Sequence, residues 1–382
     1  MIYVHVPFCR SFCTYCDFYS ERACPTQRWL DEVCAEARAR KDEIAAAAAV
    51  DTLYFGGGTP SVLPLEFIGR IADACGGRSY REWTVEVNPD DITPEYAAGL
   101  RALGVNRVSM GVQSLDDGML RWMNRRHDSD GARRAFRQLR EAGFDNVSVD
   151  VIFGVDGMDS RMLEATVRGI LDWRPEHISA YQLSVEEGSA LGRMSREGRY
   201  SDLPDEECSA QYYLVCRLLA EAGYEHYEIS NWALPGRRAV HNSAYWTRAP
   251  YVGLGPGAHS LGLMDSRPQT RTAQTPGQAA KTAETASDVT AAAAAPAGCR
   301  SAANRRSWNS EALSGWTVSR EVLSEAEIRE EQIMLGLRTE DGVRAELLQG
   351  SREGLVPAAV PGCLRIPEER WFVADDIISG LI

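Results

Sequence analysis

The residues best suited to chemistry in this sequence are three cysteines near its start. Cys9, Cys13 and Cys16 have the spacing C-x3-C-x2-C in the segment HVPFCRSFCTYCDF. Thiolates this close along the chain can converge on one soft metal centre. A structural zinc ion usually takes four protein ligands, and Cys24 supplies a fourth only at an irregular spacing. An iron–sulfur cube held by three cysteines keeps one iron open to an outside ligand. We favour that interpretation over zinc and over thiols that bind nothing.

Strands that alternate with helices must position this loop. The predicted strands are 2–6, 52–55, 84–87, 107–111, 147–153 and 177–183, and the predicted helices are 27–47, 65–76, 94–103, 115–124, 129–143 and 160–172. Such alternation indicates right-handed βαβ units and a parallel sheet. Six units are too few for a closed eightfold barrel. We therefore expect an α/β fold, an open (βα)6 three-quarter TIM-like barrel with its chemistry at the carboxyl ends of the strands.

The rest of the chain divides by composition. We expect the barrel over 1–200, an extension with a helix near 205–223 over 201–262, and a small α+β C-terminal domain over 311–382. Between them, residues 263–310 read as a flexible low-complexity insertion, because Ala, Thr, Gln and Pro dominate and large apolar residues are almost absent. The C-terminal domain contains a predicted helix through Arg338 and ends in an apolar run over 371–382.

Composition excludes several classes of protein. The 382 residues carry a formal net charge of −13, which argues against non-specific nucleic-acid binding. No stretch reaches the roughly 18 apolar residues of a membrane-spanning helix, and the start lacks the pattern of a signal peptide. We expect a cytoplasmic protein, in which the clustered members of the 10 cysteines bind metal rather than form disulfides.

Further polar and glycine residues follow the predicted strands, where a barrel site is built. Residues 56–60 read GGGTP, Glu86 ends the third strand, Gln113 ends the fourth, and Asp150 lies on the fifth. Together with the cysteine loop after the first strand, these motifs resemble the radical SAM superfamily of S-adenosylmethionine (SAM) enzymes. The resemblance runs almost the length of the chain apart from the insertion. It implies a [4Fe-4S] cluster whose open iron is chelated by SAM and whose electron cleaves SAM to a 5′-deoxyadenosyl radical.

The same resemblance implies roles for individual residues. Arg125 is expected to hold the SAM carboxylate, with its neighbour Arg126 as the alternative. The segment 154–160, GVDGMDS, departs from the G-L-P-G-Q-T of similar proteins. The remaining residues expected to bind the cofactor are Tyr3, Tyr15, Gly57, Gly58, Thr59, Glu86, Gln113, Asp150 and Ile152.

Within the superfamily, the chain is similar to the oxygen-independent coproporphyrinogen III oxidases. Those enzymes have a further cysteine where this sequence has Phe18, and an arm before the first strand, which we expect to be absent here. The segment 330–343, EEQIMLGLRTEDGV, is also similar to that wider family.

A second motif separates the chain from the oxidases. His241, Asn242, Tyr245 and Trp246 form H-N-x-x-Y-W, which resembles the signature of the HemW family of heme chaperones. A neutral imidazole is a natural axial ligand for heme iron. We therefore expect His241 to bind heme, with Tyr245 and Trp246 packed on the porphyrin, and His259 as a second candidate ligand.

The resemblance implies a heme chaperone that delivers heme to an apo-cytochrome or another heme-accepting client, and association of two copies is compatible with it. Two enzyme alternatives remain open. One is coproporphyrinogen dehydrogenation by radical chemistry, and the other is radical chemistry on an unknown small molecule.

Overall fold

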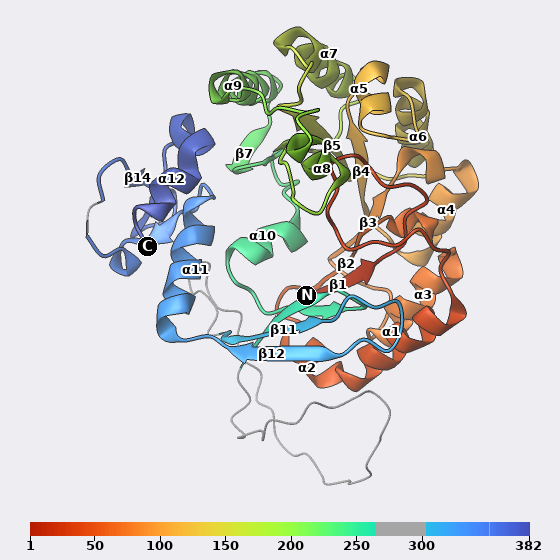
Figure 1. Cartoon of the computed structure of the whole chain (residues 1–382). Helices are drawn as coiled ribbons and strands as arrows, with labels where there is room; N and C mark the ends of the chain where they lie inside the picture. The colour runs from red at the N-terminus through yellow and green to blue at the C-terminus, as the bar shows by residue number, and fades with distance from the viewer. Residues whose placement is uncertain (264–302, 351) are drawn as a thin grey trace.

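The core of the protein is an open barrel of parallel strands. The computed structural model describes residues 1–263, 303–350 and 352–382. Six strands pair in parallel in sequence order: β1 (Ile2–Val6), β2 (Thr52–Gly57), β3 (Glu82–Val87), β4 (Arg107–Gln113), β5 (Val147–Phe153) and β6 (His177–Gln182). They form an arc with helices on its outer side (Figure 1). The predicted open (βα)6 barrel is confirmed.

The helices that follow these strands cover the convex face of the sheet. They are α1 (Gln27–Ala39), α2 (Lys41–Ala46), α3 (Leu65–Ala74), α4 (Pro94–Leu103), α5 (Asp117–Trp122), α6 (Ser129–Glu141), α7 (Ser160–Leu171) and α9 (Asp205–Glu221). Helix α8 (Ala190–Arg196) lies instead against the cysteine segment, where the Leu191 N–H donates to Thr14 O at 2.8 Å (Figure 1). Two 3₁₀ turns, η1 (Pro60–Val62) and η2 (Pro89–Asp91), follow β2 and β3. Helix α6 shows the underlying pattern. Ala132, Ala135, Phe136 and Leu139 recur at helical spacing and are all buried, and Asp128 caps the first turn by accepting from the Gly131 N–H.

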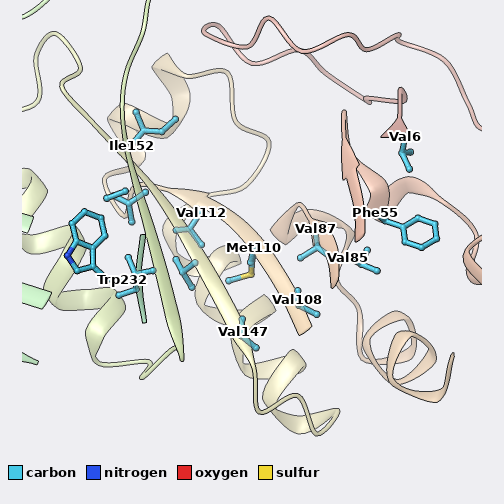
Figure 2. Close-up of a cluster of buried hydrophobic side chains, with 14 of the residues drawn as sticks. Val6, Phe55, Val85, Val87, Val108, Met110, Val112, Val147, Ile152 and Trp232 are labelled. Carbon is cyan, nitrogen blue, oxygen red and sulfur yellow. The ribbon is translucent and has the colours of Figure 1, made fainter. Parts of the chain in front are cut away.

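Alternation along the strands separates an apolar outer face from a polar inner face. Val85, Val87, Val108, Met110 and Val112 are among the buried side chains of the core between sheet and helices (Figure 2). Because successive side chains of a strand point to opposite faces, the residues between them point into the barrel. The residues of the inner face include Tyr3, Tyr54, Glu86, Arg107, Ser109, His177, Ser179 and Tyr181.

Three further strands extend the sheet at its two edges. Strands β7 (Glu225–Glu228) and β8 (Asn231–Ala233) form an antiparallel pair, and β8 pairs antiparallel with β6. At the other edge, β9 (Val252–Leu254) pairs parallel with β1. These pairings give a nine-stranded sheet of order β7-β8-β6-β5-β4-β3-β2-β1-β9.

Helix α10 (Val240–Trp246) lies between the two edges of the arc (Figure 1). Its first turn is fixed by a carboxylate from β3. The two oxygens of Glu82 accept from the backbone N–H groups of Val240 and His241, each at 2.8 Å. Glu82 is 4% exposed, so this buried cap anchors the helix that carries the H-N-x-x-Y-W motif.

The C-terminal part contains two small antiparallel sheets and two helices. Its elements are β10 (His259–Gly262), β11 (Arg305–Asn309), β12 (Val318–Val322), α11 (Glu325–Leu337), β13 (Val343–Arg344), η3 (Ala345–Leu347), β14 (Val356–Pro357), β15 (Cys363–Arg365), η4 (Glu368–Val373) and α12 (Ala374–Ser379). It packs on the barrel through His226, whose ring stacks on Trp232 at 4.1 Å and whose Nδ1 lies 2.8 Å from the Glu368 carboxylate.

Two of the expected elements need correction. The single helix predicted over 27–47 breaks at Arg40, whose guanidinium donates to Gly253 O at 2.7 Å and to Ser260 Oγ at 3.0 Å. The insertion predicted over 263–310 includes residues 305–309, which form β11 between β10 and β12. Pairing with β10 and β12 orders that end, and composition does not reveal such pairing. Residues 264–302 of the predicted insertion lie outside the described residues. Among the described helices, none is long and apolar enough to span a membrane.

We predict that Glu82→Ala lowers the free energy of unfolding by about 2 kcal/mol, because two buried N–H groups of α10 lose their acceptor. Urea unfolding of the cluster-free protein measures this. Glu66→Ala is the matched control, since that carboxylate is largely exposed and is expected to contribute less than about 0.5 kcal/mol. Equal unfolding midpoints for the two variants would contradict the anchoring role of Glu82.

Candidate functional site

The three loop cysteines lie after β1 as partly exposed free thiols. Cys9 Sγ is 3.3 Å from Thr59 Oγ1, and Cys13 Sγ accepts from Arg125 Nη1 at 3.2 Å. Burial raises the pKa of Cys16 to about 11, and the neighbouring thiols of Cys13 and Cys9 contribute to the shift. The loop therefore gathers its thiols against residues that follow β2 and β4.

The arrangement of these thiols disfavours a single zinc ion. Among the described residues, the one group of three or more ligand atoms within 4.8 Å of one another is Cys216, His226 and Glu368, which lies elsewhere. Cys9, Cys13 and Cys16 do not form such a group in this structure. An iron–sulfur cube binds each thiolate through a different iron, so it does not require such close approach.

Glycines after β2 let the backbone approach the cysteine loop. A Cβ atom on Gly58 would lie 3.0 Å from Cys9 Sγ and 3.0 Å from the carbonyl oxygens of Phe8 and Val6. Gly57 has φ +106°, and a Cβ there would meet the His5 ring at 2.7 Å. Only glycine fits at these two positions without displacing the loop or the histidine.

Two polar side chains beside the loop hold buried atoms without a partner. Gln113 follows a bulge in β4 and has φ 69°, a rare conformation for a residue other than glycine. Its Oε1 and the Nε of Arg125 are buried, and neither has a hydrogen-bond partner among the described residues. Unpaired buried polar atoms next to three free thiols fit a site built for a polar ligand.

The adjacent arginines take different positions. Besides Cys13, Arg125 donates to Asn88 Oδ1 at 2.9 Å and to Gly111 O at 2.6 Å, which holds its guanidinium under the cysteine loop. Arg126 instead pairs with Asp91 at 3.0 Å. The geometry therefore favours Arg125 as the residue that faces a ligand at the loop.

Two inward-facing carboxyl groups lie below this region. Tyr54 OH donates to Glu86 Oε1 at 2.7 Å, and burial raises the pKa of Glu86 to about 7. Ser109 Oγ donates to Asp150 at 3.4 Å, and burial raises the pKa of Asp150 to about 6. Both groups can therefore hold a proton near neutral pH.

The aromatic and apolar candidates lie on either side of these groups. Tyr3 stacks on Tyr54 with ring centroids 6.0 Å apart. Burial raises the pKa of Tyr15, which lies beside Arg125 and Cys13. Ile152 is 6% exposed on β5. Of the three, Tyr3 lines a cavity of the barrel interior, where a flat ring can pack.

The structure places His241 differently from the sequence expectation. The residue is 1% exposed, and both ring nitrogens are hydrogen-bonded: Nδ1 with Thr52 Oγ1 at 2.8 Å and Nε2 with Tyr245 OH at 3.0 Å. Burial lowers the pKa of His241 to about 3. Trp246 is partly buried at the end of the helix. In this conformation the motif holds α10 against β2 and presents no free imidazole nitrogen.

Two cavities adjoin this helix. The barrel interior encloses about 210 Å³ between β2, β4, β6 and α10. The other cavity, of about 330 Å³, lies between the end of the cysteine loop and β10, and its lining includes Phe18, Tyr19, Tyr251 and His259. Tyr3 and Tyr245 line both cavities. We call them the lumen and the aromatic cavity.

His259 is the accessible histidine of the aromatic cavity. Its side chain is exposed, and its ring stacks on Trp308 of β11 with centroids 6.5 Å apart. Phe18 beside it is 72% exposed. In the sequence, His259 is only the second candidate for a heme ligand. Trp308 lies inside the predicted insertion, where no local pattern marks it as part of a site.

We predict that Glu86→Gln removes part of the pH dependence of stability. Between its unfolded pKa near 4.5 and its folded pKa of about 7, the native state binds a proton that the unfolded state has released. Stability therefore falls as pH rises through this window, by roughly 3 kcal/mol in total. Urea unfolding of the cluster-free protein at pH 5, 6, 7 and 8 is expected to show a growing advantage of Glu86→Gln.

The exposed Glu141→Gln variant is the control, because its curve is expected to run parallel to that of the wild type. A Glu86→Gln curve parallel to both would mean that Glu86 titrates normally.

Comparison with known proteins agrees with the geometry. A family model described as the radical SAM superfamily matches residues 3–170. The chain is 35% identical over 266 residues to the heme chaperone HemW of Bacillus subtilis, covering 67% of this chain and 69% of that protein. It is 37% identical over 272 residues to the heme chaperone HemW of Mycobacterium tuberculosis, with 68% of each covered.

A mitochondrial protein and a solved structure extend the match. The chain is 32% identical over 351 residues to the radical S-adenosyl methionine domain-containing protein 1 of Bos taurus, covering 90% of this chain and 74% of that protein. The coproporphyrinogen III oxidase HemN of Escherichia coli superimposes with a TM-score of 0.67 at 17% identity, covering 99% of this chain and 88% of that one. At that identity the structural match supports the fold alone. The chain belongs to the HemW family of the radical SAM superfamily.

Proposed function

We propose that this protein is a heme chaperone that also binds a [4Fe-4S] cluster and SAM. The proposal rests first on relatives that are named heme chaperones and match more than two thirds of both chains. The observation in the structure that carries it furthest is the exposed His259 beside an aromatic cavity, next to the cysteine loop. Delivery of heme to a heme-accepting apo-protein is part of the proposal.

Cys9, Cys13 and Cys16 would hold the cluster. One iron would remain free to bind SAM, and the reduced cluster would supply an electron to the sulfonium group of SAM. Arg125 would pair with the SAM carboxylate, and its Nε, which has no hydrogen-bond partner among the described residues, is suited to that pairing. The glycines at 56–58 let SAM approach the backbone, and Gln113, Glu86 and Asp150 offer acceptors for its amino and hydroxyl groups.

We assign the heme contact to His259 rather than to His241. Ligation by His241 would require one of its two ring hydrogen bonds to break in a side chain that is 1% exposed, whereas His259 has an exposed ring. The cavity beside His259 offers Phe18, Tyr19 and Tyr251 for packing against a porphyrin. In this proposal the H-N-x-x-Y-W motif forms part of the cavity wall through Tyr245 and holds α10 against β2 through His241.

Coproporphyrinogen oxidation is the second candidate function. Its support is the similarity in fold to the oxidase HemN, at 17% identity. The position where such oxidases carry an additional cysteine is occupied by Phe18, whose ring is 72% exposed. We therefore rank oxidation below heme binding and include it in the experiments.

We predict that Cys13→Ala, reconstituted with iron and sulfide without oxygen, loses the cluster, since three thiolates are the minimum for a cube with one open iron. Iron and sulfide analysis measures this, and the iron content of the variant is expected to be close to background. Cys24→Ala is the matched control, because Cys24 is an exposed free thiol outside the motif, and full iron content is expected. A normal cluster in Cys13→Ala would refute the three-cysteine site.

We predict that His259→Ala weakens heme binding at least about tenfold, because the iron loses its axial ligand. His241→Ala is expected to lower thermal stability while heme affinity stays within about threefold of the wild type. Titration of the Soret band in the reconstituted protein measures both, with coproporphyrinogen III and SAM supplied in a parallel assay. Weak heme binding by His241→Ala with normal binding by His259→Ala would reverse the assignment of the ligand.

A further inference from the structure

Arg107 is a buried cation with no ion-pair partner among the described residues. The residue begins β4, points into the lumen and is 3% exposed. Its Nε has no hydrogen-bond partner among the described residues. No carboxylate oxygen of that part of the chain lies within 4.0 Å of the guanidinium, the limit for an ion pair. A buried arginine cannot lose its proton, so an unpaired guanidinium in a closed site is costly.

Glu86, which lines the lumen, and Asp150 and Glu228 beside it already have hydrogen-bond partners of their own, and Glu228 accepts from Asn231. Glu86 accepts from Tyr54 OH at 2.7 Å, and Asp150 accepts from Ser109. Burial raises the pKa of both carboxyl groups. They therefore offset the charge of Arg107 only from a distance and only in part.

The other polar groups of the lumen are neutral. His177 has both ring nitrogens hydrogen-bonded, to Ser148 Oγ and to Tyr227 OH, each at 2.7 Å, and burial lowers its pKa. Tyr181, Asn231 and Asn242 add neutral groups to the lining. Among the described residues, the lumen thus contains the cation of Arg107, the carboxyl group of Glu86, which is bonded to Tyr54, and otherwise neutral hydroxyl, imidazole and amide groups. The unpaired guanidinium favours an anion over a cation or an apolar ligand.

Size and geometry narrow the ligand further. A volume of about 210 Å³ is below the roughly 300–1,000 Å³ of drug-sized pockets, so the lumen holds a small group and cannot enclose a tetrapyrrole. The planar guanidinium fork matches a carboxylate in two parallel hydrogen bonds. We propose that the lumen is a binding site for a carboxylate group, which pairs with Arg107.

This site does not depend on the heme proposal, because Arg107 lies on β4 inside the barrel and does not line the aromatic cavity. The carboxylate can come from a free small molecule or from the propionate arm of a larger tetrapyrrole held in the adjoining aromatic cavity. Tyr3 and Tyr245, which line both cavities, lie between the two positions. The two sources share one chemistry at Arg107.

The test is acetate binding to the reconstituted protein. Binding is measured by saturation-transfer NMR and by the thermal unfolding midpoint. Acetate replaces chloride in the buffer so that the ionic strength stays constant. The wild type is expected to bind acetate saturably and to unfold at a higher temperature with it. Arg107→Met is expected to lose both responses and, without acetate, to unfold at the same or a higher temperature than the wild type, because an unpaired buried charge is gone. Arg134→Met, at an exposed arginine, is expected to behave as the wild type does.

Arg107→Lys covers the case in which the methionine variant does not fold. It keeps the charge but loses the paired geometry, and at least a tenfold weaker affinity for acetate is expected. Competition identifies the source: displacement of acetate by heme but not by heme dimethyl ester indicates a propionate arm, and no displacement by either indicates a free small carboxylate. An absent acetate response in the wild type, or the same response in Arg107→Met, would overturn the proposal.

Discussion

Successive side chains of the six parallel strands point to opposite faces of the sheet, and this alternation constrains the rest of the structure. Side chains such as Val85, Val108 and Met110 face the helices and form the core, so every intervening residue must face the inside of the barrel. A closed barrel fills that space with bulky apolar side chains. Here the sheet is open, and the inward positions carry Glu86, Arg107 and other polar residues. The polar groups of the barrel interior must therefore find partners in one another, in elements from outside the sheet or in ligands.

Helix α10 is the main element from outside the sheet that meets this requirement. Its histidine bonds with Thr52 of β2, its first turn is capped by Glu82 of β3, and it lies between the edges of the arc. The same helix separates the lumen from the aromatic cavity through Tyr245. The H-N-x-x-Y-W motif thus acts on heme, in our account, by shaping a wall rather than by ligating iron.

The sequence predicted the parts of the site that lie within one strand and its following loop. The spacing of Cys9, Cys13 and Cys16 and the place of Gln113 at a strand end are local features, and the structure brings them to one edge of the barrel. Burial is not local. The loss of accessibility at His241 depends on contacts with β2 and β3, far away along the chain, and no spacing reveals it. The exposure of His259 depends in turn on β11, which composition assigned to an insertion.

Heme transfer tests the central claim most directly. The reconstituted protein, loaded with one equivalent of heme, is mixed anaerobically with an excess of apo-myoglobin as the acceptor, and the Soret band of each protein is followed in time. The account predicts stoichiometric loading and transfer of heme to the acceptor, with no conversion of coproporphyrinogen III in a parallel sample that contains SAM and a reductant. Turnover of coproporphyrinogen III by a protein that binds no heme would contradict it and would identify the chain as an oxidase.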